Sequence, residues 1–160
     1  MPIRNPTDLA AELPRGARLL GFDVGEKTIG LALSDPTLAI ATPLETIRRT
    51  KFAADAARLA EIVAKHGIGG FVVGLPVNMD GSEGPRCQSV RAFARNLLAK
   101  MDLPLVFWDE RLSTAAVTRG MIEADLSRAR RAELVDKAAA AYILQGFLDR
   151  LRSLRAGPTG

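Results

Sequence analysis

Three carboxylates stand at positions where a folded chain has little structural use for a negative charge. Asp23 lies inside the apolar run Arg18-Leu-Leu-Gly-Phe-Asp-Val, and Glu110 follows the apolar run that ends at Trp108. Asp136 interrupts an amphipathic segment near the C-terminus. A buried carboxylate without a partner costs several kcal/mol, so each must be protonated, paired with a cation or bound to a metal ion. An ion pair explains any one of them, whereas three together favour a metal site.

Clustered carboxylates could hold Mg²⁺ or Mn²⁺, because both ions prefer oxygen ligands. Two such ions about 3.5–4 Å apart can activate a water and stabilise the leaving oxygen of a phosphodiester. We therefore predict Asp23, Glu110 and Asp136 both as metal ligands and as catalytic residues of a hydrolase with a two-metal-ion mechanism. Cys87 is the only cysteine, so neither an internal disulfide nor a metal site built on several cysteines can form within one chain.

The last predicted helix, over residues 132–151, gives the sharpest argument for Asp136. At about 100° per residue, Asp136 lies about 20° from both Ile143 and Phe147 around the helix. Gln145 falls on the opposite side. The side chain of Asp136 is therefore expected to face the core.

The hydrophobic pattern predicts a fold that could bring these residues together. Strand-like runs cover 18–24, 29–34, 38–47, 71–75 and 105–108, and helical periodicity covers 51–65, 85–100, 113–123 and 132–151. The order βββαβαβαα indicates an α/β fold with a five-stranded mixed sheet and helices on both faces. Pro43 suits an edge strand, because proline cannot donate a hydrogen bond to a neighbouring strand. Asp23 and Glu110 would then approach the carboxyl ends of parallel strands, where open α/β sheets bind ligands.

A single domain is expected over residues 18–152, since a chain of 160 residues with 48% hydrophobic content can fill one core. Residues 1–17 are expected to form a flexible arm, and residues 153–160 a disordered tail. The chain has no apolar run of the roughly 18 residues that a membrane-spanning helix needs, and its N-terminus lacks the apolar core of a secretory signal. We therefore expect a cytoplasmic protein without a membrane partner. The formal charge of +4 is weak support for a polyanionic partner.

Four blocks of the sequence resemble, in order, those of the YqgF family of pre-16S rRNA-processing and Holliday-junction-resolvase-like proteins. The blocks begin at Asp23, Gly74, Asp109 and Val135, and they read DVGEKTIG, GLPVNMDGSEGP, DERLST and VDKAAAAYILQ. The resemblance covers roughly residues 18–150. It implies a ribonuclease H-like fold and carries the family's acidic positions onto Asp23, Glu110 and Asp136. It also implies a nuclease linked to maturation of the 5′ end of 16S rRNA.

Further residues are candidates for substrate contact, each with a structural alternative: Gly25, Lys27, Asn78, Asp80, Ser82, Arg111, Arg130 and Arg131. Gly25 could let a phosphate approach the backbone or serve a tight turn. The polar side chains of the loop 76–85 could grip a sugar-phosphate strand or cap the following helix. Arg111 could bind a phosphate oxygen or orient a carboxylate. The arginines near residue 130 could contact nucleic acid or form a solvated face.

These observations favour a metal-dependent nuclease that acts on structured RNA in 5′-end processing of pre-16S rRNA. Resolution of Holliday junctions in branched DNA is the main alternative, because the same site could perform it. An actin-like nucleotide-binding protein, suggested by the first block, would need a second phosphate loop and a second domain, for which 160 residues leave little room. A non-catalytic nucleic-acid-binding module gains nothing from core-facing negative charge.

Overall fold

A five-stranded mixed sheet forms the centre of the structure, a computed structural model that describes residues 5–112 and 128–156. Its strands are β1 (Arg18–Val24), β2 (Thr28–Ser34), β3 (Ala41–Arg48), β4 (Ile68–Leu75) and β5 (Leu105–Asp109), in the spatial order β3-β2-β1-β4-β5. β2 pairs antiparallel with β1 and β3, whereas β4 pairs parallel with β1 and β5. The predicted mixed sheet is confirmed. Its central strand carries Asp23, and Pro43 lies on an edge strand.

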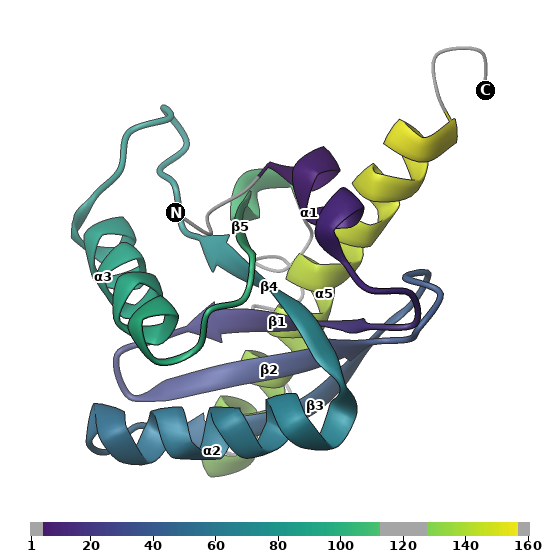
Figure 1. Ribbon diagram of the computed structural model, residues 1–160. Coiled ribbons are helices and arrows are strands. Elements are labelled where there is room, and N and C mark those ends of the chain that lie inside the picture. Colours follow the sequence, from purple (N-terminus) through teal and green to yellow (C-terminus); the bar gives the residue numbers. More distant parts are fainter. Residues whose placement is uncertain (1–4, 113–127, 157–160) are drawn as a thin grey trace.

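Helices cover both faces of this sheet, as predicted, and Figure 1 shows α5 behind the sheet, on the side away from α2. The longer helices are α2 (Phe52–His66), α3 (Pro85–Lys100) and α5 (Arg128–Ala156). Leu20 and Phe22 of β1 pack in the core beneath α2 and α3, whereas Leu19 packs beneath α5. Because alternate residues of a strand share a face, Asp23 points to the α5 side of the sheet.

A flexible arm is expected over residues 1–17, but residues 5–17, the part of it that the structure describes, pack on the domain. Asn5 caps α1 (Pro6–Glu12) by accepting a hydrogen bond from the backbone N–H of Asp8 at 2.9 Å. Leu9 of this helix is fully buried in the core beneath α5. A buried leucine contributes roughly 1.5–3 kcal/mol, which is enough to hold so short a helix against the domain. The helix α1 is therefore part of the packed structure.

α5 extends beyond the predicted helix at both ends. Residues 153–156 are helical and are not part of a disordered tail, because arginine, leucine and alanine favour a helix until the first glycine–proline pair at 157–158. Residues 157–160 and the helix predicted over 113–123 lie outside the described residues. In the described part of the chain, no helix, α5 included, is both long and apolar enough to cross a membrane.

The turn between β2 and β3 depends on the carboxylate of Asp35. This carboxylate accepts hydrogen bonds from the hydroxyl of Thr37 and from the backbone N–H groups of Thr37, Ala39 and Ile40. The hydrogen bond from the Thr37 hydroxyl, followed by those of the backbone, lowers the pKa of Asp35 below its ordinary value. Leu38 in this turn has a φ of 59°, a conformation that strains a residue with a side chain. The carboxylate therefore holds a turn that would otherwise relax.

We expect Asp35→Ala to destabilise the domain by about 1–2 kcal/mol at neutral pH, because several donors of the turn lose their acceptor. The pKa of Asp35 is lower in the folded than in the unfolded chain, so its charged form stabilises the fold above the unfolded pKa. That contribution is lost progressively as the pH falls below about 4. Urea unfolding of wild type and variant, from neutral pH to about pH 3, measures both effects. A stability difference that stays constant over this range would contradict the role assigned to the carboxylate.

Candidate active site

The three predicted carboxylates come from three elements that meet at one edge of the sheet. Asp23 lies near the carboxyl end of β1, and Glu110 begins the 3₁₀ helix η1 (Glu110–Leu112) directly after β5. Asp136 lies in the N-terminal part of α5. Because β1, β4 and β5 run parallel, their carboxyl ends share this edge.

Two glycines allow α5 and η1 to approach Asp23 closely. Gly30 of β2 is the strand partner of Asp23, and a Cβ atom added to Gly30 would lie 2.0 Å from the backbone oxygen of Asp136. On the other side of β1, the paired residues of β1 and β4 end at Phe22 and Val73. Asp23 and Gly74 are the next residues of the two strands. A Cβ atom added to Gly74 would lie 3.3 Å from the Cγ atom of Glu110. Asp136 and Glu110 therefore approach the sheet on either side of Asp23.

The three carboxylates differ in their exposure and their contacts. Asp23 is buried, with 5% of its surface exposed, whereas Glu110 and Asp136 are partly exposed. Asp136 accepts a hydrogen bond from the hydroxyl of Thr28, the first residue of β2, so its side chain faces the sheet as its helical position predicts. Each of the three carboxylates has an interaction partner in the structure. They are held side chains of the fold and not loose surface charges.

The positions and the chemistry of these residues fit a divalent metal ion. Carboxylate oxygens are the donors that Mg²⁺ and Mn²⁺ prefer, and all three residues approach one edge of the sheet. Their side chains do not, however, close around a common point. Among the residues that the structure describes, no three carboxylate, histidine or cysteine side chains form a group that could hold a metal ion. Binding of an ion by all three residues would therefore require side-chain rotation.

The loop after β4 carries three predicted substrate-binding residues, whose polar groups bond to one another. Asn78 donates from Nδ2 to the hydroxyl oxygen of Ser82 at 3.0 Å, and this hydroxyl donates to Asp80 at 2.6 Å. The hydrogen bond from Ser82 lowers the pKa of Asp80 and so favours its charged form. A negative carboxylate repels phosphate. These contacts favour a scaffold role for the three side chains within the loop.

Arg111 contacts a carboxylate, which is one of the two alternatives left open by the sequence. Its guanidinium donates to both carboxylate oxygens of Asp109 at 2.7–3.1 Å. Its Nη1 also donates to the backbone oxygen of Met79 at 3.3 Å. The hydrogen bonds from Arg111 lower the pKa of Asp109. The carboxylate that Arg111 orients is thus Asp109, and the same side chain connects η1 to the loop after β4.

The remaining predicted substrate-binding residues lie in the β1–β2 turn and at the start of α5. Gly25 accepts a hydrogen bond from Arg49 at 2.7 Å, and its φ angle is not in the left-handed region. The turn therefore does not need glycine there for its backbone conformation. Lys27 is exposed at the tip of the turn. Arg130 and Arg131 belong to α5, but their side chains lie outside the described part of the structure.

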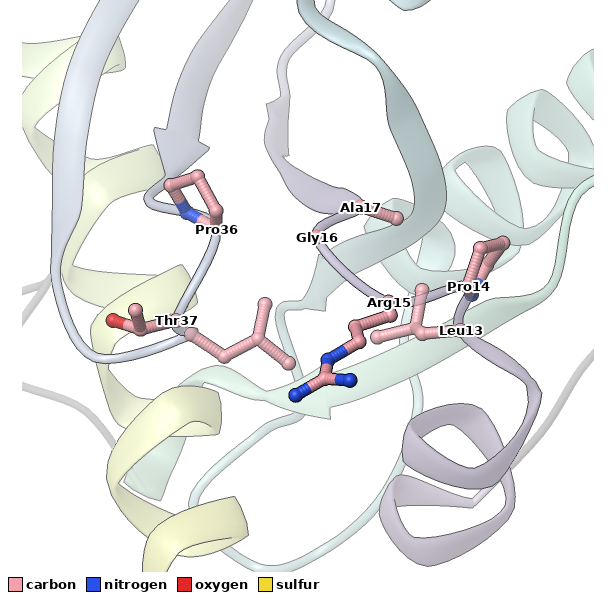
Figure 2. A pocket seen from close by; sticks show the side chains of 8 residues that line it. Leu13, Pro14, Arg15, Gly16, Ala17, Pro36 and Thr37 are labelled. Atoms are coloured by element: carbon pink, nitrogen blue, oxygen red, sulfur yellow. The ribbon is translucent and has the colours of Figure 1, made fainter.

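A hollow of about 240 Å³ lies away from the carboxylate edge, and Figure 2 shows the side chains of Leu13 and Arg15 beside it, with Pro36 and Thr37 across from them. Its walls come from residues 13–17 and 36–38, next to the amino end of β1 and the carboxyl end of β2. Asp23 lies at the opposite end of β1. The hollow contains none of the predicted site residues and is separate from the candidate active site.

Sequence reasoning missed two features of this site. The first is the close approach of other elements at Gly30 and Gly74, and the second is the hydrogen bond from Thr28 to Asp136. A glycine inside an apolar strand weakens the strand and often marks a point where another backbone approaches. Both glycines interrupt such runs, so this signal was present in the sequence. The hydrogen bond between Thr28 and Asp136 had no such signal, because the two residues are 108 positions apart and no local pattern connects them.

The sequence matches known proteins over nearly its whole length. Residues 17–150 match the protein family described as "RuvX: Holliday junction resolvase". A relative from Paramagnetospirillum magneticum is 66% identical over 149 residues, which cover 93% of this chain and 96% of the relative. A relative from Roseobacter denitrificans is 60% identical over 158 residues, which cover 98% of this chain and 97% of the relative. Both relatives carry the name "Putative pre-16S rRNA nuclease".

Solved structures of junction resolvases share the fold at low sequence identity. RuvC of T. thermophilus, in complex with a Holliday junction substrate, matches with a TM-score of 0.54 at 15% identity, over 86% of this chain and 97% of the RuvC chain. The yeast mitochondrial Holliday junction resolvase Ydc2 matches with a TM-score of 0.54 at 12% identity, over 94% of this chain and 85% of its own. These likenesses confirm the predicted ribonuclease H-like fold.

Proposed function

Because the chain belongs to the RuvX family, we propose that it is a nuclease that hydrolyses phosphodiester bonds in the 5′-end processing of pre-16S rRNA. The family match agrees with the resemblance of the four sequence blocks. The observation that carries the proposal is the edge of the sheet at which Asp23, Glu110 and Asp136 approach one another. The names of the relatives support RNA as the substrate. A role in rRNA maturation would place the chain in the cytoplasm.

The proposed cofactor is Mg²⁺ or Mn²⁺, with Asp23, Glu110 and Asp136 as its ligands. When bound, such ions supply an activated water and neutralise charge that develops on the phosphate. Asp23 is the fixed ligand, because it is buried on the central strand. Thr28 holds the Asp136 carboxylate against the sheet through its hydroxyl, and this hydrogen bond would orient the carboxylate as a ligand. Glu110 is partly exposed at the start of η1, where a phosphodiester strand can reach the edge from solvent.

Cleavage of branched DNA is the second candidate function, since the description of the family names Holliday junction resolvase activity. The same three carboxylates could serve either substrate, because a metal-assisted hydrolysis acts on the phosphodiester and not on the sugar. A binding module without catalysis is less well supported. Binding of nucleic acid alone gains nothing from negative charge at this edge of the sheet.

Purified protein incubated with matched RNA and DNA substrates tests these alternatives. The substrates are an RNA with the 5′ extension of pre-16S rRNA and a four-way DNA junction, each with Mn²⁺, with Mg²⁺ or with a chelator. We expect metal-dependent cleavage of the RNA. Cleavage of the junction alone would instead establish the resolvase function. Binding of both substrates without cleavage of either would contradict a nuclease.

Binding of RNA is expected to weaken steeply with salt if Arg130 and Arg131 contact phosphates, because each neutralised phosphate releases counterions. Replacing both arginines with alanine should reduce the magnitude of the slope of log K against log salt by about 1.4–1.8. The matched control is the double variant Arg150→Ala/Arg152→Ala, which removes two exposed charges near the other end of the same helix. Fluorescence anisotropy over a salt series provides the measurement. Equal slopes for the two double variants would mean that Arg130 and Arg131 contact solvent and not phosphates.

A further inference from the structure

The loop after β4 presents an apolar side chain at the edge that carries the candidate active site. The loop covers residues 76–84, and Met79 at its tip is 87% exposed. It leaves β4 at the carboxyl end, beside β5 and η1. A methionine in this position contributes little to the core, because most of its surface is in solvent. A single exposed apolar side chain is common on protein surfaces, so what singles out Met79 is its place at this edge, where the backbone of Met79 contacts Arg111 of η1.

Hydrogen bonds shape the loop before any ligand binds. The backbone N–H of Asn78 donates to the carbonyl oxygen of Ser82 at 2.9 Å, and that of Gly81 donates to Asn78 at 2.8 Å. Gly81 has a φ of 90°, a conformation that favours glycine. The side chains of Asn78, Asp80 and Ser82 are hydrogen-bonded to one another. The loop is thus a closed turn whose polar side chains are engaged and whose apolar Met79 faces solvent.

Two arginines anchor this turn to the rest of the domain. Glu83 accepts a two-point contact from Arg91 of α3 at 2.7 and 2.8 Å. Arg111 donates to the backbone oxygen of Met79 itself at 3.3 Å. The second anchor comes from the residue that follows Glu110 in the chain. The position of Met79 is therefore coupled to η1, which carries one of the candidate catalytic residues.

The chemistry of the tip suits the face of a nucleic-acid base better than a phosphate. Asp80, next to Met79, carries a negative charge that repels phosphate, whereas the charge of Glu83 is paired with Arg91. A methionine thioether packs favourably against aromatic faces, and methionine is among the apolar residues that insert between bases. In a continuous duplex both faces of each base are already stacked. A base face is therefore open to Met79 only where the strand is unpaired or distorted.

Resting on the proposed nuclease function, we propose that Met79 contacts the face of an unpaired base beside the phosphodiester that is cleaved. The loop would then select RNA that is single-stranded or distorted next to the carboxylate edge. Arg111 acts in this arrangement as a positioning residue, because it holds the backbone of Met79 and does not itself bind the strand. Asn78, Asp80 and Ser82 shape the turn that presents the methionine.

The test compares two fluorescently labelled RNAs that differ only in whether the segment beside the cleavage position is unpaired or paired. Binding is measured by anisotropy in the presence of a chelator, so that no cleavage occurs. Met79→Ala should weaken binding to the unpaired RNA by about three- to tenfold and change binding to the paired RNA by less than about twofold. Met79→Phe should restore binding, because an aromatic ring stacks well on a base. Ile40→Ala removes another apolar side chain, which is 63% exposed in the turn between β2 and β3, and should change binding to neither RNA.

Two results would overturn the inference. The first is wild-type affinity of Met79→Ala for the unpaired RNA, and the second is equal weakening for both RNAs. If binding of RNA is unchanged but self-association of the chain decreases in sedimentation, Met79 belongs to an interface between protein copies. A wild-type protein that binds neither RNA would contradict the proposed function itself. If the wild type binds the RNA and cleaves it with metal, and Met79→Ala binds the unpaired RNA as tightly as the wild type does, only this inference is contradicted and the proposed function stands.

Discussion

Asp23→Asn is expected to lower the rate of cleavage by at least about 100-fold while the domain stays folded. Asparagine keeps the shape of the side chain but removes the negative charge that a divalent ion needs. Loss of an outer partner of a metal ligand costs roughly 10–100-fold, so loss of the ligand itself should cost no less than the upper value. Single-turnover cleavage of the 5′-extended RNA with Mn²⁺ measures the rate, and urea unfolding measures stability.

A second buried aspartate provides the control for this experiment. Asp55 of α2 is 4% exposed, on the face of the sheet opposite to α5, and accepts hydrogen bonds from Thr50 at 3.3 and 3.4 Å. Asp55→Asn is therefore expected to alter stability without altering the cleavage rate. A cleavage rate of folded Asp23→Asn close to that of wild type would remove Asp23 from the active site.

Binding of the metal can also be followed without any substrate. An ion at concentration c that binds only the folded chain stabilises it by RT ln(1 + c/Kd), so the melting temperature rises with the logarithm of the ion concentration once that concentration exceeds the Kd. Mn²⁺ should therefore raise the melting temperature of wild type and of Asp55→Asn, but not that of Asp23→Asn. Equal shifts for all three proteins would show that the ion binds at another site. Because no RNA is present in this measurement, it tests the metal ligands independently of the choice of RNA as substrate.

The sheet and its carboxylate edge could be predicted because independent local signals agree. The apolar run at 71–75 has no alternation, which is typical of a strand buried on both faces, and β4 is such a strand. Pro43 predicts an edge strand, and Asp23 stands out because every other residue of β1 after Arg18 is apolar or glycine. The alternation of side chains along β1 then decides the face to which Asp23 points.

Contacts between distant segments could not be predicted in the same way. Arg111 has two carboxylates beside it in the sequence, Asp109 and Glu110, and only the folded geometry selects Asp109. The polar residues of the loop after β4 suggest a phosphate grip, but their hydrogen bonds are directed inward. Leu9 gives too weak a signal on its own, since one apolar residue defines no periodicity. In each case the side chain's partner lies on another element or across a turn, where residue type alone does not determine the pairing.

Gly30→Ala should have the second large effect, because it acts on the contact between α5 and the sheet. The added Cβ atom would lie 2.0 Å from the backbone oxygen and 2.2 Å from the backbone carbon of Asp136, and 2.9 Å from the backbone nitrogen of Lys137. These are backbone atoms and cannot rotate away, so α5 must move. We expect a loss of about 3 kcal/mol in the free energy of unfolding, which is typical of overpacking at a rigid contact. Displacement of Asp136 by about 1 Å would also lower the cleavage rate by about 100-fold.

Gly74→Ala supplies the graded comparison, because its added Cβ atom would meet the end of a flexible side chain. The nearest atom is Cδ1 of Ile143 at 2.5 Å, which can move by a change of rotamer. The expected destabilisation is therefore only about 1 kcal/mol. Urea unfolding and single-turnover cleavage of both variants give the comparison, with the Mn²⁺-dependent shift in melting temperature as a third readout. If Gly30→Ala is as stable and as active as wild type, α5 does not pack on β2 at Asp136, and Asp136 would lose its place beside Asp23.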